Sequence, residues 1–183
     1  MNKVDNEKLL SLIEGIREGE EKAFKEFFFI MQPHIFYYTF RLTSDKQAAE
    51  DLTQETFIKF WLCSERLNTE LSFKAYLYKI ARNLTLNYIN RKPPVSYINE
   101  EKNFLVMLSN ADKELDNVFF MDDCQKAIET LPQRCRETFV LSRFGGFDYS
   151  EIAEIMGVSL QTVKNQMNKA ISVLKTLLSS HLS

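Results

Sequence analysis

Glycine and proline are scarce in this chain, which has only five glycines and four prolines in 183 residues. β-Sandwiches and Rossmann-type folds need many turns, and disordered chains contain many helix-breaking residues, so the scarcity argues against all three. Apolar residues make up 45% of the chain and charged residues 26%, an ordinary balance for a globular protein. We therefore expect an all-α protein.

Cysteine content and hydropathy indicate the cellular compartment in which the chain would function. Its three cysteines, Cys63, Cys124 and Cys135, are scattered and have no metal-ligand spacing, so we expect neither a disulfide framework nor a metal site. This usage indicates a reducing compartment, the cytoplasm. The longest apolar runs, 27–31 and 104–108, have five residues, whereas a membrane-spanning helix needs about 20. Export and membrane insertion are therefore not expected.

Charge divides the chain into three parts. The net charge of −2 consists of +1 over residues 1–98, −5 over 99–123 and +2 over 124–183. Pro93 and Pro94 end the helix before them, and helical periodicity then fades. We predict two small helical bundles joined by an acidic linker, with boundaries at 1–93, 94–117 and 118–183. Apolar periodicity predicts helices over 5–18, 20–42, 44–63, 72–92, 118–130, 132–144, 149–156 and 160–179.

Two helix starts show capping signals. Ser44 followed by Gln47 predicts a capping box for the helix over 44–63. Asp148 followed by Glu151 predicts another for the helix over 149–156. In such a box, two side chains satisfy backbone N–H groups that the helix itself leaves without partners.

The segment 149–167 has the sharpest local pattern. Ala153 is small where two helices would cross, and Gly157 follows four residues later at the tightest point of a turn. Ser159 can cap the next helix, and Val163 then falls on its buried side. This spacing predicts a helix-turn-helix.

The second helix of that motif leaves polar residues free in its N-terminal half. Lysine can contact phosphate there, while glutamine and asparagine can hydrogen-bond to base edges in a major groove. The alternative is a helical hairpin with an ordinary polar surface. The residues concerned are Gln161, Lys164, Asn165, Asn168 and Lys169.

The helix over 72–92 is a second candidate for nucleic-acid binding. From Phe73 to Lys92 it has five cations, no acidic residue and interleaved tyrosines, which suits a strand whose bases leave the duplex and stack. The alternative places Tyr88 in the core and Tyr76 half in the core, and leaves the cations as a solvated face. The cations are Lys74, Lys79, Arg82, Arg91 and Lys92, and the tyrosines are Tyr76, Tyr78 and Tyr88.

Catalytic chemistry is poorly represented in the sequence. The two histidines, His34 and His181, have no candidate nucleophile or second ligand near them in sequence. Gly145-Gly146 lacks the Lys-Ser/Thr that a phosphate-binding loop requires. We therefore expect a binding protein rather than an enzyme, with no catalytic residue, cofactor or metal.

Three segments, taken in order, resemble motifs of the extracytoplasmic-function (ECF) group of bacterial RNA polymerase sigma factors, part of the sigma-70 family. Residues 49–61 look like the core-binding stretch of sigma domain 2, and residues 73–91 look like its −10 promoter helix. Residues 131–139, followed by the helix-turn-helix, look like sigma domain 4, which reads the −35 element. Tyr76 stands where the family commonly has tryptophan, and Asn87 where aspartate is usual. These two differences bear on which promoter sequence the chain would recognise, not on its role as a sigma factor.

The resemblance implies partners and contact residues. The partners are core RNA polymerase (its β′ clamp helices and β flap), promoter DNA and an inhibitory anti-sigma factor. Leu52 would also hold its helix in the bundle, and the loop 64–71 would hold a flipped base of the −10 element. Polymerase contacts would come from Asp51, Leu52, Gln54, Glu55 and Lys59. The −10 contacts would come from Asn68, Lys74, Tyr76, Lys79, Arg82, Asn83 and Arg91, and the −35 contacts from Ser159, Gln161, Thr162, Lys164, Asn165, Asn168 and Lys169.

The expected function is that of an ECF-type sigma factor directing promoter recognition, DNA melting and transcription initiation. Because the chain is slightly acidic, we expect the free protein to bind duplex DNA weakly. Holding both bundles on one polymerase can raise avidity by ~100-fold or more. The linker is either a solvated tether or, by analogy with the family, a segment that threads the RNA-exit path of the polymerase, where its negative charge can mimic nascent RNA. The alternative function is a stand-alone helix-turn-helix regulator whose N-terminal module senses a ligand or dimerises.

Overall fold

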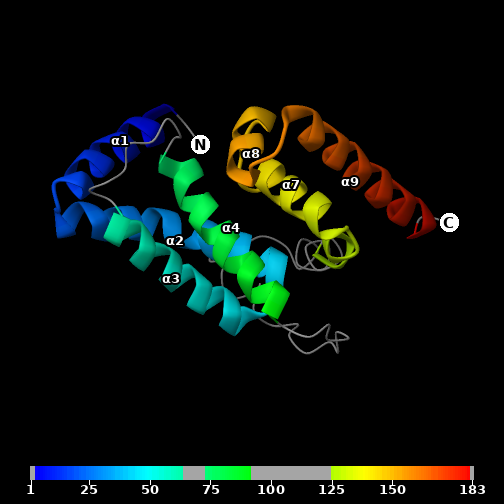
Figure 1. Ribbon diagram of the computed structural model, residues 1–183, viewed down its shortest axis with the longest axis horizontal. Helices are drawn as coiled ribbons and strands as arrows, with labels where there is room; N and C mark the ends of the chain where they lie inside the picture. Colours follow the sequence, from blue (N-terminus) through cyan, green and yellow to red (C-terminus); the bar gives the residue numbers. More distant parts are fainter. Residues whose placement is uncertain (1–2, 64–72, 92–124, 182–183) are drawn as a thin grey trace, which may run out of the picture.

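The computed structural model describes residues 3–63, 73–91 and 125–181, and these residues form helices and short turns without a strand (Figure 1). The N-terminal bundle comprises α1 (Lys3–Arg17), α2 (Glu21–Thr43), α3 (Lys46–Cys63) and α4 (Phe73–Arg91). The C-terminal bundle comprises the helical residues 125–129, then α7 (Gln133–Arg143), α8 (Tyr149–Met156) and α9 (Leu160–His181). The bounds of these seven labelled helices agree with the predicted ones to within two residues. None of the described helices is long and apolar enough to cross a membrane.

Aromatic rings from α2 and α3 form the centre of the N-terminal bundle. Phe27 and Phe60 stack with ring centroids 5.1 Å apart, and Phe57 meets Phe27 edge-on at 6.2 Å. These three side chains are at most 2% exposed. Phe57 and Phe60 are three residues apart on α3, so both lie on the side of the helix that faces the core.

The predicted capping box of Ser44 and Gln47 is wrong. Ser44 ends α2 instead, in the left-handed conformation (φ 52°), and its N–H donates to the Phe40 carbonyl oxygen. The next residue caps α3, because the Asp45 carboxylate accepts a hydrogen bond from the Ala48 N–H at 3.0 Å. The side chain of Gln47 points along the helix and donates to Asp51. The turn between α2 and α3 is therefore one residue longer than predicted, because Ser44 ends α2 and Asp45 caps α3.

The helix-turn-helix of the C-terminal bundle forms as predicted. Asp148 and Glu151 make a complete capping box at the start of α8. Gly157 ends α8 at φ 66°, a conformation that glycine adopts without steric cost. Ser159 caps α9, with its hydroxyl accepting from the Thr162 N–H at 3.1 Å, and Val163 is completely buried.

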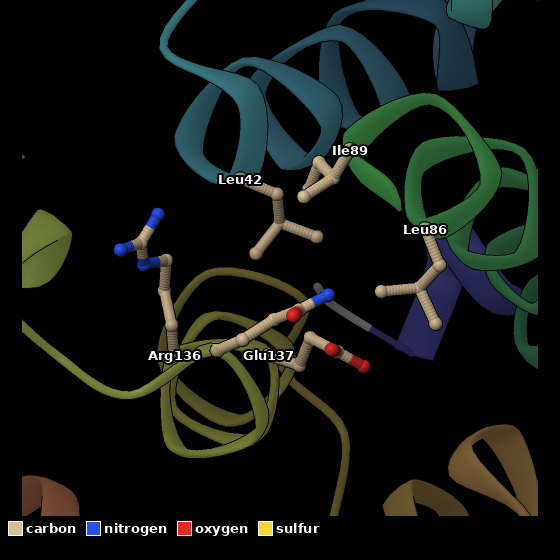
Figure 2. A pocket seen from close by; sticks show the side chains of 6 residues that line it. Leu42, Leu86, Ile89, Arg136 and Glu137 are labelled. Carbon is tan, nitrogen blue, oxygen red and sulfur yellow. The ribbon is translucent and has the colours of Figure 1, made fainter. Parts of the chain in front are cut away.

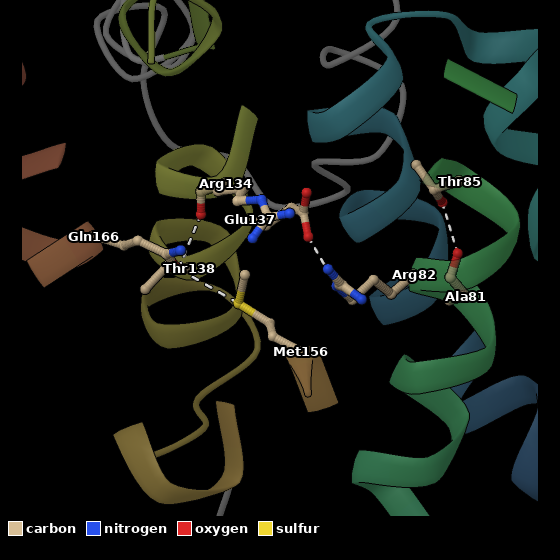
Figure 3. A network of polar contacts seen from close by, with 8 residues as sticks. All are labelled: Ala81, Arg82, Thr85, Arg134, Glu137, Thr138, Met156 and Gln166. Carbon is tan, nitrogen blue, oxygen red and sulfur yellow. Dashed lines mark hydrogen bonds and ion pairs between the residues drawn. The ribbon is translucent and has the colours of Figure 1, made fainter. Parts of the chain in front are cut away.

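A hydroxyl of α7 joins the three helices of the C-terminal bundle. Thr138 hydrogen-bonds to Gln166 of α9 at 2.7 Å and contacts the sulfur of Met156 of α8 at 3.4 Å (Figure 3). Thr138 itself is fully buried. The orientation of α9 is thus fixed by both packing and a polar contact.

The two bundles pack against each other. Figure 1 shows α7 and α8 beside α2 and α4, and a single cluster of buried apolar residues continues from one bundle into the other. Tyr78 of α4 meets Phe147 edge-on, with ring centroids 4.8 Å apart. The sequence predicts two bundles around a linker, but it does not predict this shared core.

Candidate protein and nucleic-acid interfaces

The first half of α9 presents the polar surface expected of a recognition helix. Its buried side is occupied by Val163, Met167 and Ala170, each at most 1% exposed. Because these residues repeat every three or four positions, the residues between them point to solvent. The exposed residues are Gln161, Lys164, Asn165, Asn168 and Lys169, all five of the polar positions singled out in the sequence.

Local hydrogen bonds order part of this surface. Gln161 donates to the side-chain oxygen of Asn165 at 3.0 Å, which holds the two amides together on the exposed face. The hydroxyl oxygens of Ser159 and Thr162 lie 2.8 Å apart and share a hydrogen bond. Their hydroxyls support the start of the helix, so any contact with DNA has to compete with that bond or share it. Lys164 and Lys169 supply positive charge on the same face.

Helix α4 has two faces that differ in what they contact. Tyr76, Lys79 and Asn83 follow one another at spacings of three and four, with Asn83 exposed and the other two partly exposed. Lys74, Tyr78 and Arg82 follow at spacings of four and lie on a different face. That second face meets the C-terminal bundle. The predicted −10 contacts are thus divided between an open face and a covered one.

The covered face of α4 makes specific polar contacts. Arg82 donates to the Glu137 carboxylate at 2.8 Å, and Lys74 donates to the Gly145 carbonyl oxygen at 2.5 Å (Figure 3 shows the Arg82 pair). The ammonium group of Lys74 also lies 4.5 Å from the centre of the Phe147 ring. Burial lowers the pKa of Lys74 from its ordinary value. In this structure neither cation is free to meet a phosphate.

Tyr76 lies beside α3, near the end of the N-terminal bundle. Its ring centroid is 6.3 Å from that of Phe60. Burial raises the pKa of Tyr76, and a hydrogen bond with the Cys63 side chain adds to the effect. Arg91 is exposed at the C-terminal end of α4. Asn68 and the loop 64–71 lie outside the described residues.

The polar residues of α3 form the candidate polymerase surface. Asp51, Gln54, Glu55 and Lys59 are all exposed, and Glu55 pairs with Lys59 at 2.9 Å along the helix. Leu52 is only 6% exposed, so in this structure it holds α3 in the bundle and offers no surface to a partner.

Two apolar residues on the same side of α3 were missed by the sequence analysis. Ile58 is 58% exposed and Leu62 is 74% exposed, although both are large apolar side chains. They follow Asp51, Gln54 and Glu55 at spacings of three and four, so they lie on the polar face rather than on the buried stripe. That position was the available signal, because an apolar residue on the solvent side of an amphipathic helix suggests a partner.

Comparison with known families identifies the two bundles. The family model for Sigma-70 region 2 matches residues 30–93, and the model for Sigma-70, region 4 matches residues 122–174. The ECF RNA polymerase sigma factor SigW of Bacillus subtilis (strain 168) is 29% identical over 173 residues, covering 89% of this chain and 92% of that protein. The chain belongs to the ECF group of the sigma-70 family. As a sigma factor it acts in transcription initiation, and it is not an enzyme.

Other comparisons agree with this membership. The ECF RNA polymerase sigma-E factor of Escherichia coli (strain K12) is 29% identical over 174 residues, covering 87% of this sigma factor and 88% of that one. Among solved structures, CnrH in complex with the cytosolic domain of CnrY superposes with a TM-score of 0.71 at 18% identity, covering 92% and 96% of the two chains. The sigma factor RpoE from Bartonella quintana, in complex with the anti-sigma factor NepR, gives 0.70 at 24% identity, covering 86% and 98%. These two structures support the all-α fold.

Proposed function

We propose that this sigma factor directs core RNA polymerase to promoters through three surfaces: α3 for the polymerase, α4 for the −10 element and α9 for the −35 element. The boundaries 1–93, 94–117 and 118–183 would separate the first two surfaces, the linker and the third. The protein would work in the cytoplasm, where RNA polymerase is. The observation that carries the proposal is the exposed polar face of α9, at the correct place in a complete helix-turn-helix.

The −35 surface is suited to reading the major groove. Asn165, Asn168 and Gln161 offer amide donors and acceptors to base edges, and Lys164 and Lys169 can each neutralise a phosphate. With about two phosphate contacts, the logarithm of the binding constant should fall by only about two for each tenfold rise in salt. Such a reader is weak alone, so its specificity depends on being held near the promoter by the polymerase.

The polymerase surface combines charge with exposed apolar area. Ile58 and Leu62 would provide the apolar centre of the contact, and Asp51, Glu55 and Lys59 would provide the polar rim. This arrangement is common at protein interfaces, where apolar residues are buried and charged residues surround them. We place the clamp helices of the β′ subunit here and the β flap on the C-terminal bundle.

The −10 surface would begin at the open face of α4. Tyr76 can stack on a base, and Lys79 and Asn83 can contact the backbone or a base edge of a separated strand. The loop 64–71, with Asn68, would receive a flipped base. Strand separation of this kind draws on protein contacts and needs no nucleotide hydrolysis by this chain.

An anti-sigma factor is a further proposed partner. The solved relatives CnrH and RpoE are described in complexes, the latter with the anti-sigma factor NepR. The exposed apolar residues of α3 give such an inhibitor a surface for which it would compete with the polymerase.

In vitro transcription with purified core polymerase tests this function. We expect transcripts with defined start sites when the chain is added, and none without it. A gel shift on the mapped promoters should show a stable complex only when core polymerase and the chain are both present. A tight, sequence-specific complex with the chain alone would instead support a stand-alone helix-turn-helix regulator.

A further inference from the structure

Two amide side chains on α9 are hydrogen-bonded to each other on the surface. The Gln161 amide donates to the Asn165 side-chain oxygen at 3.0 Å, and both residues are exposed. Because they are four residues apart, about one turn of the helix, the pair lies along one side of α9, the side that faces solvent. The bond fixes which part of the Asn165 amide accepts and which part donates.

Polar side chains around the cavity between the bundles are used differently. Figure 2 shows apolar side chains of α2 and α4 facing Arg136 and Glu137 across a space of about 170 Å³. Glu137 accepts a hydrogen bond from Arg82 at 2.8 Å, and Arg136 donates to the Leu131 carbonyl oxygen at 3.3 Å. Both charged side chains that line this cavity therefore have partners within the chain, whereas the pair on α9 lies where a ligand can reach it.

The start of α9 favours the observed direction of the bond. Gln161 is the second residue of the helix, where the first backbone N–H groups concentrate partial positive charge. This charge stabilises an amide oxygen but not an amide NH₂ group. The Gln161 oxygen is therefore favoured on the side of the helix start, and its NH₂ group on the side of Asn165. Reversing both amides would place the Gln161 NH₂ group against the positive end of the helix.

The bond leaves Asn165 able to hold one base by two contacts. A side-chain amide oxygen has two lone pairs, and Gln161 occupies one of them. Adenine presents an N6 amino donor and an N7 acceptor in the major groove, which match one acceptor and one donor of an amide. Asn165 can therefore bind adenine through both atoms while it keeps the bond to Gln161.

Guanine fits the held amide poorly. It presents two acceptors, O6 and N7, where adenine presents a donor and an acceptor. The Asn165 oxygen, held by Gln161, would lie against O6, and two acceptors repel each other. An unsupported amide can swing so that its NH₂ group meets both acceptors and its oxygen meets water. The bond from Gln161 thus converts a general polar contact into one that distinguishes the two purines.

The other side chains of α9 agree with adenine as the base that is read. The helix contains no arginine, whose planar fork matches O6 and N7 of guanine. It contains no acidic residue, so cytosine has no carboxylate partner there. Lys164 and Lys169 remain, and the proposed −35 contacts use both on phosphates.

We propose that Asn165 reads one adenine of the −35 element through N6 and N7, and that Gln161 is its positioning residue. The proposal rests on the proposed function of α9. A bidentate contact of this kind discriminates by about 5- to 150-fold against a wrong base. Loss of Gln161 should remove most of the preference for adenine over guanine. Much of the affinity for the promoter should remain, because the other contacts are unchanged.

Base analogues in a mapped promoter identify the contact. Gel shifts with holoenzyme, made from core polymerase and the full chain, measure affinity as each −35 adenine is replaced in turn. 7-Deazaadenine lacks the N7 acceptor, and unsubstituted purine lacks the N6 amino group. At one adenine, each analogue should weaken binding by about fivefold or more. Asn165→Ala should remove both effects at that position, whereas Asn168→Ala, the matched control on the same face, should keep them.

Variants of Gln161 test its positioning role. The measured quantity is the ratio of the holoenzyme affinities for adenine and for guanine at the position so identified. Gln161→Met has a similar length but no donor, and it should lower this ratio by about fivefold or more. Gln161→Lys keeps a donor for Asn165 and should preserve the ratio, since its added charge strengthens binding to both promoters equally. Because the position is exposed, both variants should unfold at the wild-type Tm.

The outcomes separate adenine reading from the proposed function. Adenine reading by Asn165 is wrong if the mapped promoters have no adenine in the −35 element, or if Asn165→Ala responds to the analogues as the wild type does. Positioning by Gln161 is wrong if Gln161→Met keeps the wild-type ratio. Transcription from defined start sites would still support the proposed function in each of these cases. If the holoenzyme transcribes no promoter, the proposed function fails and adenine reading fails with it.

Discussion

Replacing Asp148 by alanine tests how much the capping box contributes to the helix-turn-helix. The Asp148 carboxylate accepts hydrogen bonds from the Ser150 and Glu151 N–H groups at 2.8 and 2.9 Å, and Glu151 returns one to the Asp148 N–H at 2.9 Å. Helix α8 has only eight residues. Because the first N–H groups of a helix lack intrahelical partners, two of the eight backbone donors of α8, those of Ser150 and Glu151, depend on the Asp148 carboxylate.

The expected loss follows from these contacts. Removing a capping side chain costs about 1 kcal/mol, and removing a carboxylate from a helix N-terminus costs about 0.3–1 kcal/mol more. Asp148 is exposed, so water can replace part of what is lost. We therefore expect Asp148→Ala to lower the free energy of unfolding by about 1–2 kcal/mol. For a chain of this size that corresponds to a fall in Tm of about 3–6 °C.

Thermal unfolding followed by circular dichroism measures the effect. Asp148→Asn keeps an acceptor but loses the charge, so at low salt it should lose about half as much stability as Asp148→Ala. At high salt the charge effect is screened, and Asp148→Asn should then differ little from the wild type. Glu154→Ala, on the exposed side of the same helix, should change stability by less than about 0.5 kcal/mol. The reasoning is refuted if Asp148→Ala unfolds at the wild-type temperature, or if Glu154→Ala is equally destabilising.

Three further predictions concern the core, the inter-bundle ion pair and the −35 surface. Phe60→Ala should lower the free energy of unfolding by about 3–5 kcal/mol because its ring is fully buried, whereas Phe29→Ala, at a 65% exposed position, should have little effect in the same denaturant titration. Burial raises the pKa of Glu137 above its usual value, although Arg82 opposes the shift. Folding therefore takes up a proton, so wild type should gain stability relative to Glu137→Gln as the pH falls from neutral through the raised pKa, and equal pH profiles would contradict this. Lys164→Ala should weaken promoter binding by the holoenzyme and reduce the salt slope by about one, with Tm unchanged; an unaltered slope would remove Lys164 from the phosphate contacts.

Local rules account for what the sequence predicted well. The Asp148 cap, the left-handed Gly157 and the buried Val163 depend on residues within one or two turns of each other. Short spacings in the sequence therefore predict their geometry. The exposed face of α9 follows from the same periodicity, since the polar residues fall between the buried ones. Contact between this face and DNA is a proposal, but the exposure of its polar residues could be predicted from the sequence.

The turn after α2 shows where a local rule is insufficient. Ser44 and Asp45 are both good capping residues, and the sequence alone does not say which one starts α3. The choice is made by the end of α2, where Ser44 takes the left-handed conformation and satisfies the Phe40 carbonyl. A rule that considers only the start of the next helix misses this competition.

The division of α4 into an open and a covered face could not be predicted. Arg82 and Glu137 are 55 residues apart in sequence, and Lys74 and Gly145 are 71 apart. A cation on a helix has the same sequence pattern whether it faces water, a phosphate or a distant carboxylate. Only the packing of the two bundles decides which of these it meets.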